Sequence, residues 1–216
     1  MNVTKNYFAQ LKVQKIMPII HSKNFHNDVK KIESIITDYK NIKLIEITLR
    51  ESESYQNAIK LVKYFPKIKF GLGSILKLES FNEIDKKKFN FFVSPSTISE
   101  IVTKMPQNYI PGAETISEFN YLYNLGYKVI KFFPATLNDG CKKLKSIETI
   151  YKDLYFIPTG GINKKNMNDF FYFIYLSFKN ISPLRIFQII ESKKLILNGL
   201  CLELGASEQS DKNFSN

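Results

Sequence analysis

The chain has 216 residues, of which 44% are apolar and 24% are charged, so its composition is that of a folded globular protein of one or two domains. Its formal net charge is +11, but 29 of its 31 basic residues are lysines and only Arg50 and Arg185 are arginines. Sites that read nucleic acids depend on arginine for bidentate contacts, so this composition disfavours a nucleic-acid partner. The two cysteines and two histidines form no metal-ligand spacing, so we expect neither a disulfide framework nor a bound metal.

Signals for export or membrane insertion are not evident in the sequence. The N-terminal stretch MNVTKNYFAQLKVQK has no apolar segment followed by a small-residue cleavage site, so no secretion signal is expected. The most apolar stretch, residues 170–176, is far shorter than the ~20 residues that cross a bilayer. We therefore expect a soluble, cytoplasmic protein with no membrane partner.

Short runs rich in β-forming residues recur along the chain and alternate with polar, lysine-rich spans. The runs are 17–22, 43–49, 69–75, 90–96, 108–114, 128–134, 154–160 and 195–200. The spans between them carry apolar residues at helical spacing; after the second run, Ala58, Leu61 and Phe65 fall on one face of a helix. Strands that alternate with helices predict a parallel sheet.

Eight strand–helix units in about two hundred residues fit a closed (β/α)8 TIM barrel, which is the α/β fold that we predict. An open, doubly wound sheet is the alternative, but no run ends in the GxGxxG pattern that often accompanies it. No linker-like segment divides the chain, so residues 1–202 are expected to form one domain. Its C-terminal unit is expected to be irregular, because Pro183 interrupts the aromatic segment 170–191, and residues 203–216 are expected to form a loose tail.

The run KVIKFFP places a lysine in the middle of a strand. Period two puts Val129, Lys131 and Phe133 on one face of this strand. Inside a barrel the amine would lie in low-dielectric surroundings that favour its neutral form, and a neutral amine is the nucleophile that attacks a carbonyl to form a Schiff base. A lysine that reaches the barrel mouth and pairs with a carboxylate is the structural alternative.

A second ionisable residue lies within an apolar strand, in the run KLIEITLR. Leu44, Glu46 and Thr48 share one face, and Arg50 follows on that face at the carboxyl end of the strand. A glutamate in this setting is costly unless it is paired or functional, and an inward carboxylate suits an amine nucleophile as a proton shuttle. The guanidinium of Arg50 suits a substrate carboxylate. A purely structural ion pair between Glu46 and Lys131 is the alternative.

Small and hydroxyl residues follow three further strands, at the end of the barrel where active sites lie. They are Gly71, Gly73 and Ser74 after the third run, Ser94, Pro95 and Ser96 after the fourth, and Thr159, Gly160 and Gly161 after the seventh. Gly71 and Gly73 would leave room for a ligand, and Gly160 and Gly161, ahead of a helix-cap residue at Asn163, fit a phosphate-binding loop. Each group taken alone also fits an ordinary turn between strand and helix.

Six motifs occur in order between residues 10 and 169: LIEITLR, GLGSIL, FFVSP, YIPGAETISEF, IKFFPA and IPTGGI. On these motifs the chain resembles the bacterial 2-keto-3-deoxy-6-phosphogluconate / 4-hydroxy-2-oxoglutarate aldolases, which are class I enzymes on a (β/α)8 barrel. The combination of IKFFPA and PTGGI at this separation is specific to that family.

The resemblance implies a role for each matched residue. Lys131 would form the Schiff base, Glu46 would be the general acid/base, and Arg50 would hold the carboxylate at the pyruvate end of the substrate. Ser74 stands where the family usually has threonine and keeps the hydroxyl. The other substrate-binding residues that the resemblance implies are Pro95, Phe133, Thr159, Gly160 and Gly161. It further implies a homotrimer that acts on a small keto acid and needs no metal or other cofactor.

The C-terminal part departs from the family pattern. The family commonly has glycine where this chain has Ser96, and its eighth strand usually ends in GGS, which completes the phosphate site. With the eighth strand at 195–200, the nearest candidates are Asn198, Gly199 and Leu200. We therefore predict that Leu200 replaces the phosphate-binding serine and weakens the preference for the phosphorylated substrate.

The activity implied is cleavage of 2-keto-3-deoxy-6-phosphogluconate to pyruvate and glyceraldehyde 3-phosphate, and of 4-hydroxy-2-oxoglutarate to pyruvate and glyoxylate. Two other functions stay open. One is a degenerate barrel that keeps the fold with little activity, which the altered C-terminal part suggests. The other is a basic protein whose lysine surface binds nucleic acid, which the scarcity of arginine disfavours.

Overall fold

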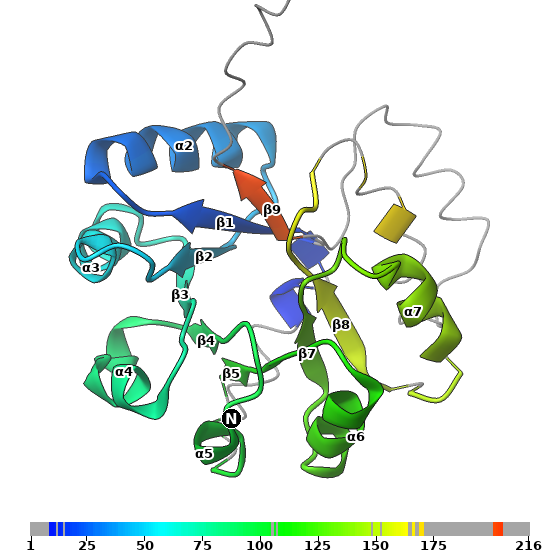
Figure 1. Ribbon diagram of the computed structural model, residues 1–216. Helices are drawn as coiled ribbons and strands as arrows, with labels where there is room; N and C mark the ends of the chain where they lie inside the picture. The colour runs from blue at the N-terminus through cyan, green and yellow to red at the C-terminus, as the bar shows by residue number, and fades with distance from the viewer. Residues whose placement is uncertain are drawn as a thin grey trace, which may run out of the picture.

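The protein alternates parallel strands with helices, and the helices lie outside a ring of strands (Figure 1). The structure is a computed structural model that describes residues 9–170, except positions 12, 15, 105, 107, 148, 152, 164, 165, 167 and 168, together with residues 201–204.

The strands are β1 (Met17–His21), β2 (Leu44–Thr48), β3 (Lys69–Gly73), β4 (Phe91–Val93), β5 (Tyr109–Ile110), β6 (Gly112–Ala113), β7 (Val129–Phe132), β8 (Tyr155–Pro158) and β9 (Cys201–Leu204). Strands β1 to β8 lie within the first seven predicted runs, whereas β9 lies outside the eighth. The strands pair in parallel as a six-stranded sheet, β5-β4-β3-β2-β1-β9, and a three-stranded sheet, β6-β7-β8. The predicted (β/α)8 barrel is confirmed, with β5 and β6 as two halves of its fifth strand.

Pro111 separates β5 from β6 and joins the two sheets. Proline has no N–H to donate to a neighbouring strand, but its carbonyl oxygen accepts a hydrogen bond of 2.9 Å from the Lys131 N–H of β7. The segment therefore pairs with β4 before Pro111 and with β7 after it. In Figure 1 the ring continues through this point.

Helices connect successive strands and cover the outer face of the ring. They are α2 (Phe25–Asp38), α3 (Ser54–Tyr64), α4 (Leu78–Glu83), the 3-10 helix η1 (Lys86–Lys88), α5 (Ser99–Val102), α6 (Ile116–Asn124) and α7 (Gly140–Ile147). Sequence signals set their ends: α2 starts where the Asn24 side chain accepts a hydrogen bond from the Asn27 N–H. α6 starts at a reciprocal capping box between Thr115 and Glu118. None of the helices within the described residues is long and apolar enough to span a membrane.

Alternation along the strands divides the core into two layers. In β1, Met17 and Ile19 face the barrel interior, whereas Ile20 packs against the outer helices. In β7, Val129 faces the interior and Ile130 faces the helices. Inward positions therefore alternate with outward ones, as the period-two reading predicts, so an inward polar residue lies among apolar side chains.

Gln14, which is 5% exposed, lies at the amino-terminal ends of β1 and β2. Its amide nitrogen donates to the carbonyl oxygens of Ile16 and Leu44 at 2.6 and 2.9 Å. Its amide oxygen accepts from the N–H groups of Lys43 and Leu44 at 3.0 and 2.8 Å. Leu11 packs against the interior cluster from the same side. Gln14 thus links β1 to β2 at the amino-terminal end of the barrel, opposite the end at which barrel active sites lie.

The position of the eighth barrel strand corrects the sequence-based prediction. The strand beside β1 is β9 at Cys201–Leu204, with Ile19 in register with Glu203, and not the run 195–200, which lies outside the described residues. Both runs are short and rich in apolar residues, so the apolar pattern alone could not separate them. β9 also includes Glu203 and Leu204, which the sequence pattern alone places in the tail. Among the described strands, β8 and β9 stand at the ends of their sheets and do not pair with each other.

Candidate active site

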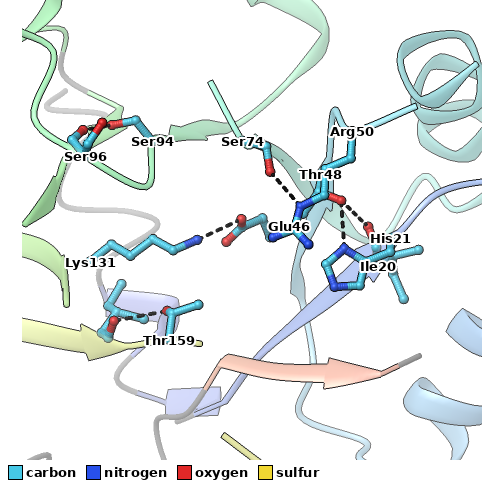
Figure 2. A network of polar contacts seen from close by, with 11 residues as sticks. Ile20, His21, Glu46, Thr48, Arg50, Ser74, Ser94, Ser96, Lys131 and Thr159 are labelled. Atoms are coloured by element: carbon cyan, nitrogen blue, oxygen red, sulfur yellow. Dashed lines mark hydrogen bonds and ion pairs between the residues drawn. The ribbon is translucent and has the colours of Figure 1, made fainter. Parts of the chain in front are cut away.

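Lys131 of β7 and Glu46 of β2 face each other inside the barrel (Figure 2). The Lys131 Nζ donates a hydrogen bond to Glu46 Oε1 over 3.3 Å. The two side chains are only 8% and 1% exposed. The inward orientation that strand alternation predicts is therefore confirmed for both residues, and the fold brings together two groups that lie 85 positions apart.

The surroundings of this pair are apolar. Glu46 is in register with Ile19 on β1, and Lys131 is in register with Ile157 on β8. Both isoleucines belong to the interior cluster, together with Val93. Taking two charges out of water costs several kcal/mol per ion, which their attraction offsets only in part. A pair kept at such a cost fits a chemical role better than a stabilising one.

Gly71 and Gly73 make space for protein side chains, which corrects the expectation that they leave room for a ligand. A Cβ atom on Gly73 would lie 2.0 Å from Glu46 Oε1, so the carboxylate occupies the space that this glycine leaves. A Cβ on Gly71 would lie 2.2 Å from the Phe91 ring. Gly73 therefore belongs to the site because it lets Glu46 sit where Lys131 reaches it.

Arg50 and Ser74 meet at the mouth of the barrel, just beyond the ends of β2 and β3 (Figure 2). The Arg50 Nε donates a hydrogen bond to Ser74 Oγ over 3.3 Å. Ser74 has a φ of +62°, a left-handed conformation that is uncommon for a residue with a side chain and that clusters at functional sites. The predicted carboxylate-binding arginine and the hydroxyl thus lie together on the Glu46 side of the mouth.

His21 and Thr48 form a polar contact that the sequence reading did not single out. His21 Nδ1 and Thr48 Oγ1 are hydrogen-bonded at 3.0 Å, at the carboxyl ends of β1 and β2. Thr48 is two residues beyond Glu46 on the same face. The alternation of Met17, Ile19 and His21 was the available signal, because it directs the imidazole toward the interior.

The turn after β4 is supported from the outer layer of the core. The Tyr109 hydroxyl donates to Ser94 Oγ at 2.6 Å, and Ser94 Oγ donates to the Ser96 carbonyl at 2.6 Å. Burial raises the pKa of Tyr109 to about 12. Pro95, at the centre of this turn, lies against Gly112, where a Cβ would come within 2.2 Å of the Pro95 carbonyl carbon.

The remaining predicted residues gather on the Lys131 side of the mouth. The Phe133 ring centroid is 5.8 Å from Lys131 Nζ. Thr159 is 1% exposed and follows β8 on its inward face. Gly160 and Gly161 have φ values of +95° and +74°, which glycine adopts at little cost. A Cβ on Gly160 would also come within 2.9 Å of the Phe133 ring.

This arrangement suits a carbonyl compound that carries an acid group. An amine and a carboxylate in contact provide a nucleophile and a proton carrier, and the guanidinium of Arg50 matches a carboxylate. Across the part of the chain that the structure describes, no cluster of three or more His, Cys, Asp or Glu residues could hold a metal ion.

Comparison with known proteins agrees with this geometry. Residues 8–193 match the model of the family described as "KDPG and KHG aldolase". The KHG/KDPG aldolase of Escherichia coli (strain K12) is 29% identical over 170 residues, which cover 77% of this chain and 76% of that protein. A 2-dehydro-3-deoxy-phosphogluconate aldolase of Pseudomonas aeruginosa is 30% identical over 131 residues, covering 58% of this chain and 59% of that protein.

A solved structure supports the same relationship. The KDPG aldolase from Legionella pneumophila, captured with pyruvate as a covalent carbinolamine intermediate, superposes with a TM-score of 0.69 at 27% identity. The match covers 75% of this chain and 79% of that one. The family match extends over most of the chain, so the protein belongs to the KDPG and KHG aldolase family.

Proposed function

We propose that this protein is a class I aldolase. It cleaves 2-keto-3-deoxy-6-phosphogluconate to pyruvate and glyceraldehyde 3-phosphate, and 4-hydroxy-2-oxoglutarate to pyruvate and glyoxylate. The observation that carries the proposal is the buried contact of 3.3 Å between Lys131 and Glu46, in a chain of this family.

In the first half of the proposed reaction, Lys131 becomes covalently bound to the substrate. A proton passes from Lys131 to Glu46, and the resulting neutral amine attacks the C2 ketone. The N–C2 bond forms as the C2–O π bond breaks, and a proton passes from the nitrogen to the oxygen to give a carbinolamine. Glu46 then protonates that hydroxyl, which leaves as water, and an iminium ion results. The contact of 3.3 Å between the two side chains supports these roles, because a proton carrier must lie within hydrogen-bond reach of the group that it serves.

In the second half, the iminium nitrogen is the electron sink. Glu46, now a carboxylate, removes the proton of the C4 hydroxyl, the C3–C4 bond breaks, and its electron pair forms an enamine while C4 leaves as an aldehyde. Protonation of C3 and addition of water release pyruvate and regenerate the amine. Because the iminium accepts the electron pair, the proposed reaction needs no metal or other cofactor.

Residues at the mouth would hold the substrate. We assign the carboxylate at the pyruvate end to Arg50, with Ser74 beside it as a second donor. Pro95, Phe133 and Thr159 would line the pocket.

The phosphate of the larger substrate would bind at the glycine loop after β8. We assign it to Gly160 and Gly161, in line with the general position of phosphate sites after the seventh and eighth barrel strands. The shift of the eighth strand to β9 removes Leu200 from this assignment, because Leu200 precedes the strand. Directly after β9 the sequence reads Gly205-Ala206-Ser207, close to the GGS that usually ends this strand in the family. We therefore propose Ser207 as the hydroxyl donor to the phosphate.

Assembly and location also remain proposals. We propose a homotrimer that works in the cytoplasm on a small keto acid. A single domain over residues 1–202, extended by β9 to Leu204, is the proposed unit. Sedimentation of the purified protein tests the trimer.

Trapping with borohydride tests the proposed function. Pyruvate plus borohydride should reduce the iminium to a stable secondary amine on Lys131, which peptide mapping locates among the 29 lysines. Lys128 is the matched control, since it lies next to the same strand but is exposed and pairs with Asp153. Labelling should disappear in Lys131→Met and persist in Lys128→Met. Labelling elsewhere overturns the mechanism, and a folded protein with neither labelling nor turnover indicates the degenerate barrel.

A further inference from the structure

The loop that follows β7 is bonded to the glycine segment that follows β8. The Ala135 N–H donates to the Thr159 carbonyl oxygen at 2.7 Å. The Gly160 carbonyl oxygen accepts two hydrogen bonds from Thr136, one from its N–H at 3.3 Å and one from its hydroxyl at 3.0 Å. Two successive carbonyl groups of the glycine segment are therefore fixed by one neighbouring loop.

Packing makes the contact with Thr136 specific. A Cβ atom on Gly161 would lie 2.2 Å from Thr136 Oγ1 and 3.1 Å from Thr136 Cβ, so the threonine side chain packs directly over the glycine α-carbon. Gly160 and Gly161 both have positive φ, so this stretch of backbone leaves the strand in a conformation that other residues rarely adopt. Thr136 thus holds a segment whose own conformational freedom is large.

The hydrogen bonds determine where the N–H groups of the glycines point. The peptide bonds before Gly160 and Gly161 are trans, so the C=O of one residue and the N–H of the next point in opposite directions. Since the carbonyls of Thr159 and Gly160 point toward the β7–α7 loop, the N–H groups of Gly160 and Gly161 point away from it. Successive N–H groups turned to one side form a concavity that binds anions.

We infer that Thr136 is a positioning residue for phosphate recognition. Its hydroxyl fixes the Gly160 carbonyl and so directs the following N–H toward the substrate phosphate, without contact between Thr136 and the substrate. This inference rests on the proposed function and extends it to a residue outside the catalytic pair. It predicts that Thr136 affects the phosphorylated substrate and not the unphosphorylated one.

The experiment compares two variants and two substrates. Thr136→Val keeps the volume and the branched Cβ but removes the hydroxyl donor, whereas Thr136→Ser keeps the donor. For Thr136→Val we expect KM for 2-keto-3-deoxy-6-phosphogluconate to rise about 3- to 10-fold, the range for one neutral hydrogen bond, with kcat nearly unchanged. For 4-hydroxy-2-oxoglutarate, kcat/KM should stay at the wild-type value. Thr136→Ser should behave as wild type with both substrates.

A binding measurement separates this inference from the proposed function. Inorganic phosphate is titrated into 15N-labelled protein, and the amide signals of Gly160 and Gly161 are followed. Wild type and Thr136→Ser should show saturable shifts, with weaker binding in Thr136→Val. Phosphate binding without any aldolase turnover would overturn the proposed function and leave the inference standing. Any of three results would overturn the inference: an equal loss of kcat/KM with both substrates, an unchanged KM in Thr136→Val, or no phosphate-dependent shift of the Gly160 and Gly161 amide signals.

Discussion

The interior of the barrel and its carboxyl-terminal rim position polar groups by different means. In the interior, Lys131 and Glu46 project from strands, and the register of β2 and β7 with their neighbours fixes them among apolar side chains. At the rim, Ser74, Gly160 and Gly161 adopt left-handed backbone conformations, and hydrogen bonds between loops hold them in place. Strand alternation therefore determines which side chains enter the interior. At the rim, tertiary contacts determine the backbone conformations that position the polar groups.

The largest effect should come from the interior, through Glu46→Gln. Glutamine keeps the volume and can still accept a hydrogen bond from Lys131, but it cannot transfer protons. We expect kcat for 4-hydroxy-2-oxoglutarate to fall by about 10² to 10⁴, the usual range for loss of a general acid/base, while the variant stays folded. Steady-state kinetics and thermal unfolding, measured on the same preparation, check both parts. A lower melting temperature with full turnover would instead indicate a structural ion pair.

Gly73→Ala tests whether the space left by Gly73 positions the Glu46 carboxylate. The new methyl group would lie 2.0 Å from Glu46 Oε1, so the carboxylate must leave the position in which it contacts Lys131. A displacement of about 1 Å can lower a rate about 10²-fold, and we expect a fall in kcat of that order. Gly71→Ala is the matched control, because its methyl group would meet the Phe91 ring and not the carboxylate.

The two glycine variants should differ in what they lose. Gly71→Ala overpacks the interior and should lower stability by about 1–3 kcal/mol, while the folded fraction keeps its kcat. Gly73→Ala should lose kcat beyond what its change in stability explains. Urea unfolding together with kcat per folded molecule tests this, and equal losses of kcat in both variants would contradict the role given to Gly73.

The inward side chains could be predicted from the sequence, whereas the contacts that depend on strand pairing and on the rim could not. Alternation within KVIKFFP and KLIEITLR was sufficient to direct Lys131 and Glu46 inward, because a strand has only two faces. It could not show that Gly73 accommodates the carboxylate, since that contact depends on the pairing of β2 with β3. Nor could it locate the eighth strand, because the run 195–200 and β9 have similar apolar patterns and only pairing with β1 separates them. The left-handed Ser74 likewise carries no sequence signal.

Ser207→Ala tests the corrected end of the barrel. If Ser207 donates to the phosphate, its removal should lower kcat/KM for 2-keto-3-deoxy-6-phosphogluconate by about 10- to 150-fold, the range for a hydrogen bond to a charged group. The value for 4-hydroxy-2-oxoglutarate should stay the same. Leu200→Ser is the control, and it should leave the ratio of the two substrates unchanged because residue 200 precedes β9. A change of ratio in Leu200→Ser alone would restore the original strand assignment.

The smallest effect concerns the support that the outer core gives to the rim. Burial raises the pKa of Tyr109 to about 12, above the value of 10.0 that applies to a solvated tyrosine, and its hydrogen bond with Ser94 opposes this shift without cancelling it. Between these values the unfolded chain loses the phenolic proton and the folded protein keeps it, so stability falls as pH rises. The contribution of Tyr109 to the free energy of unfolding is complete below pH 10, and the loss should reach about 1.4 kcal/mol at pH 11.

The variant Tyr109→Phe has no such proton, while both proteins share the titration of the lysines. Urea unfolding at pH 8 and pH 11 should therefore show a smaller fall in the free energy of unfolding for the variant. Equal falls in the two proteins would mean that the Tyr109 hydroxyl is not buried beside the turn in solution.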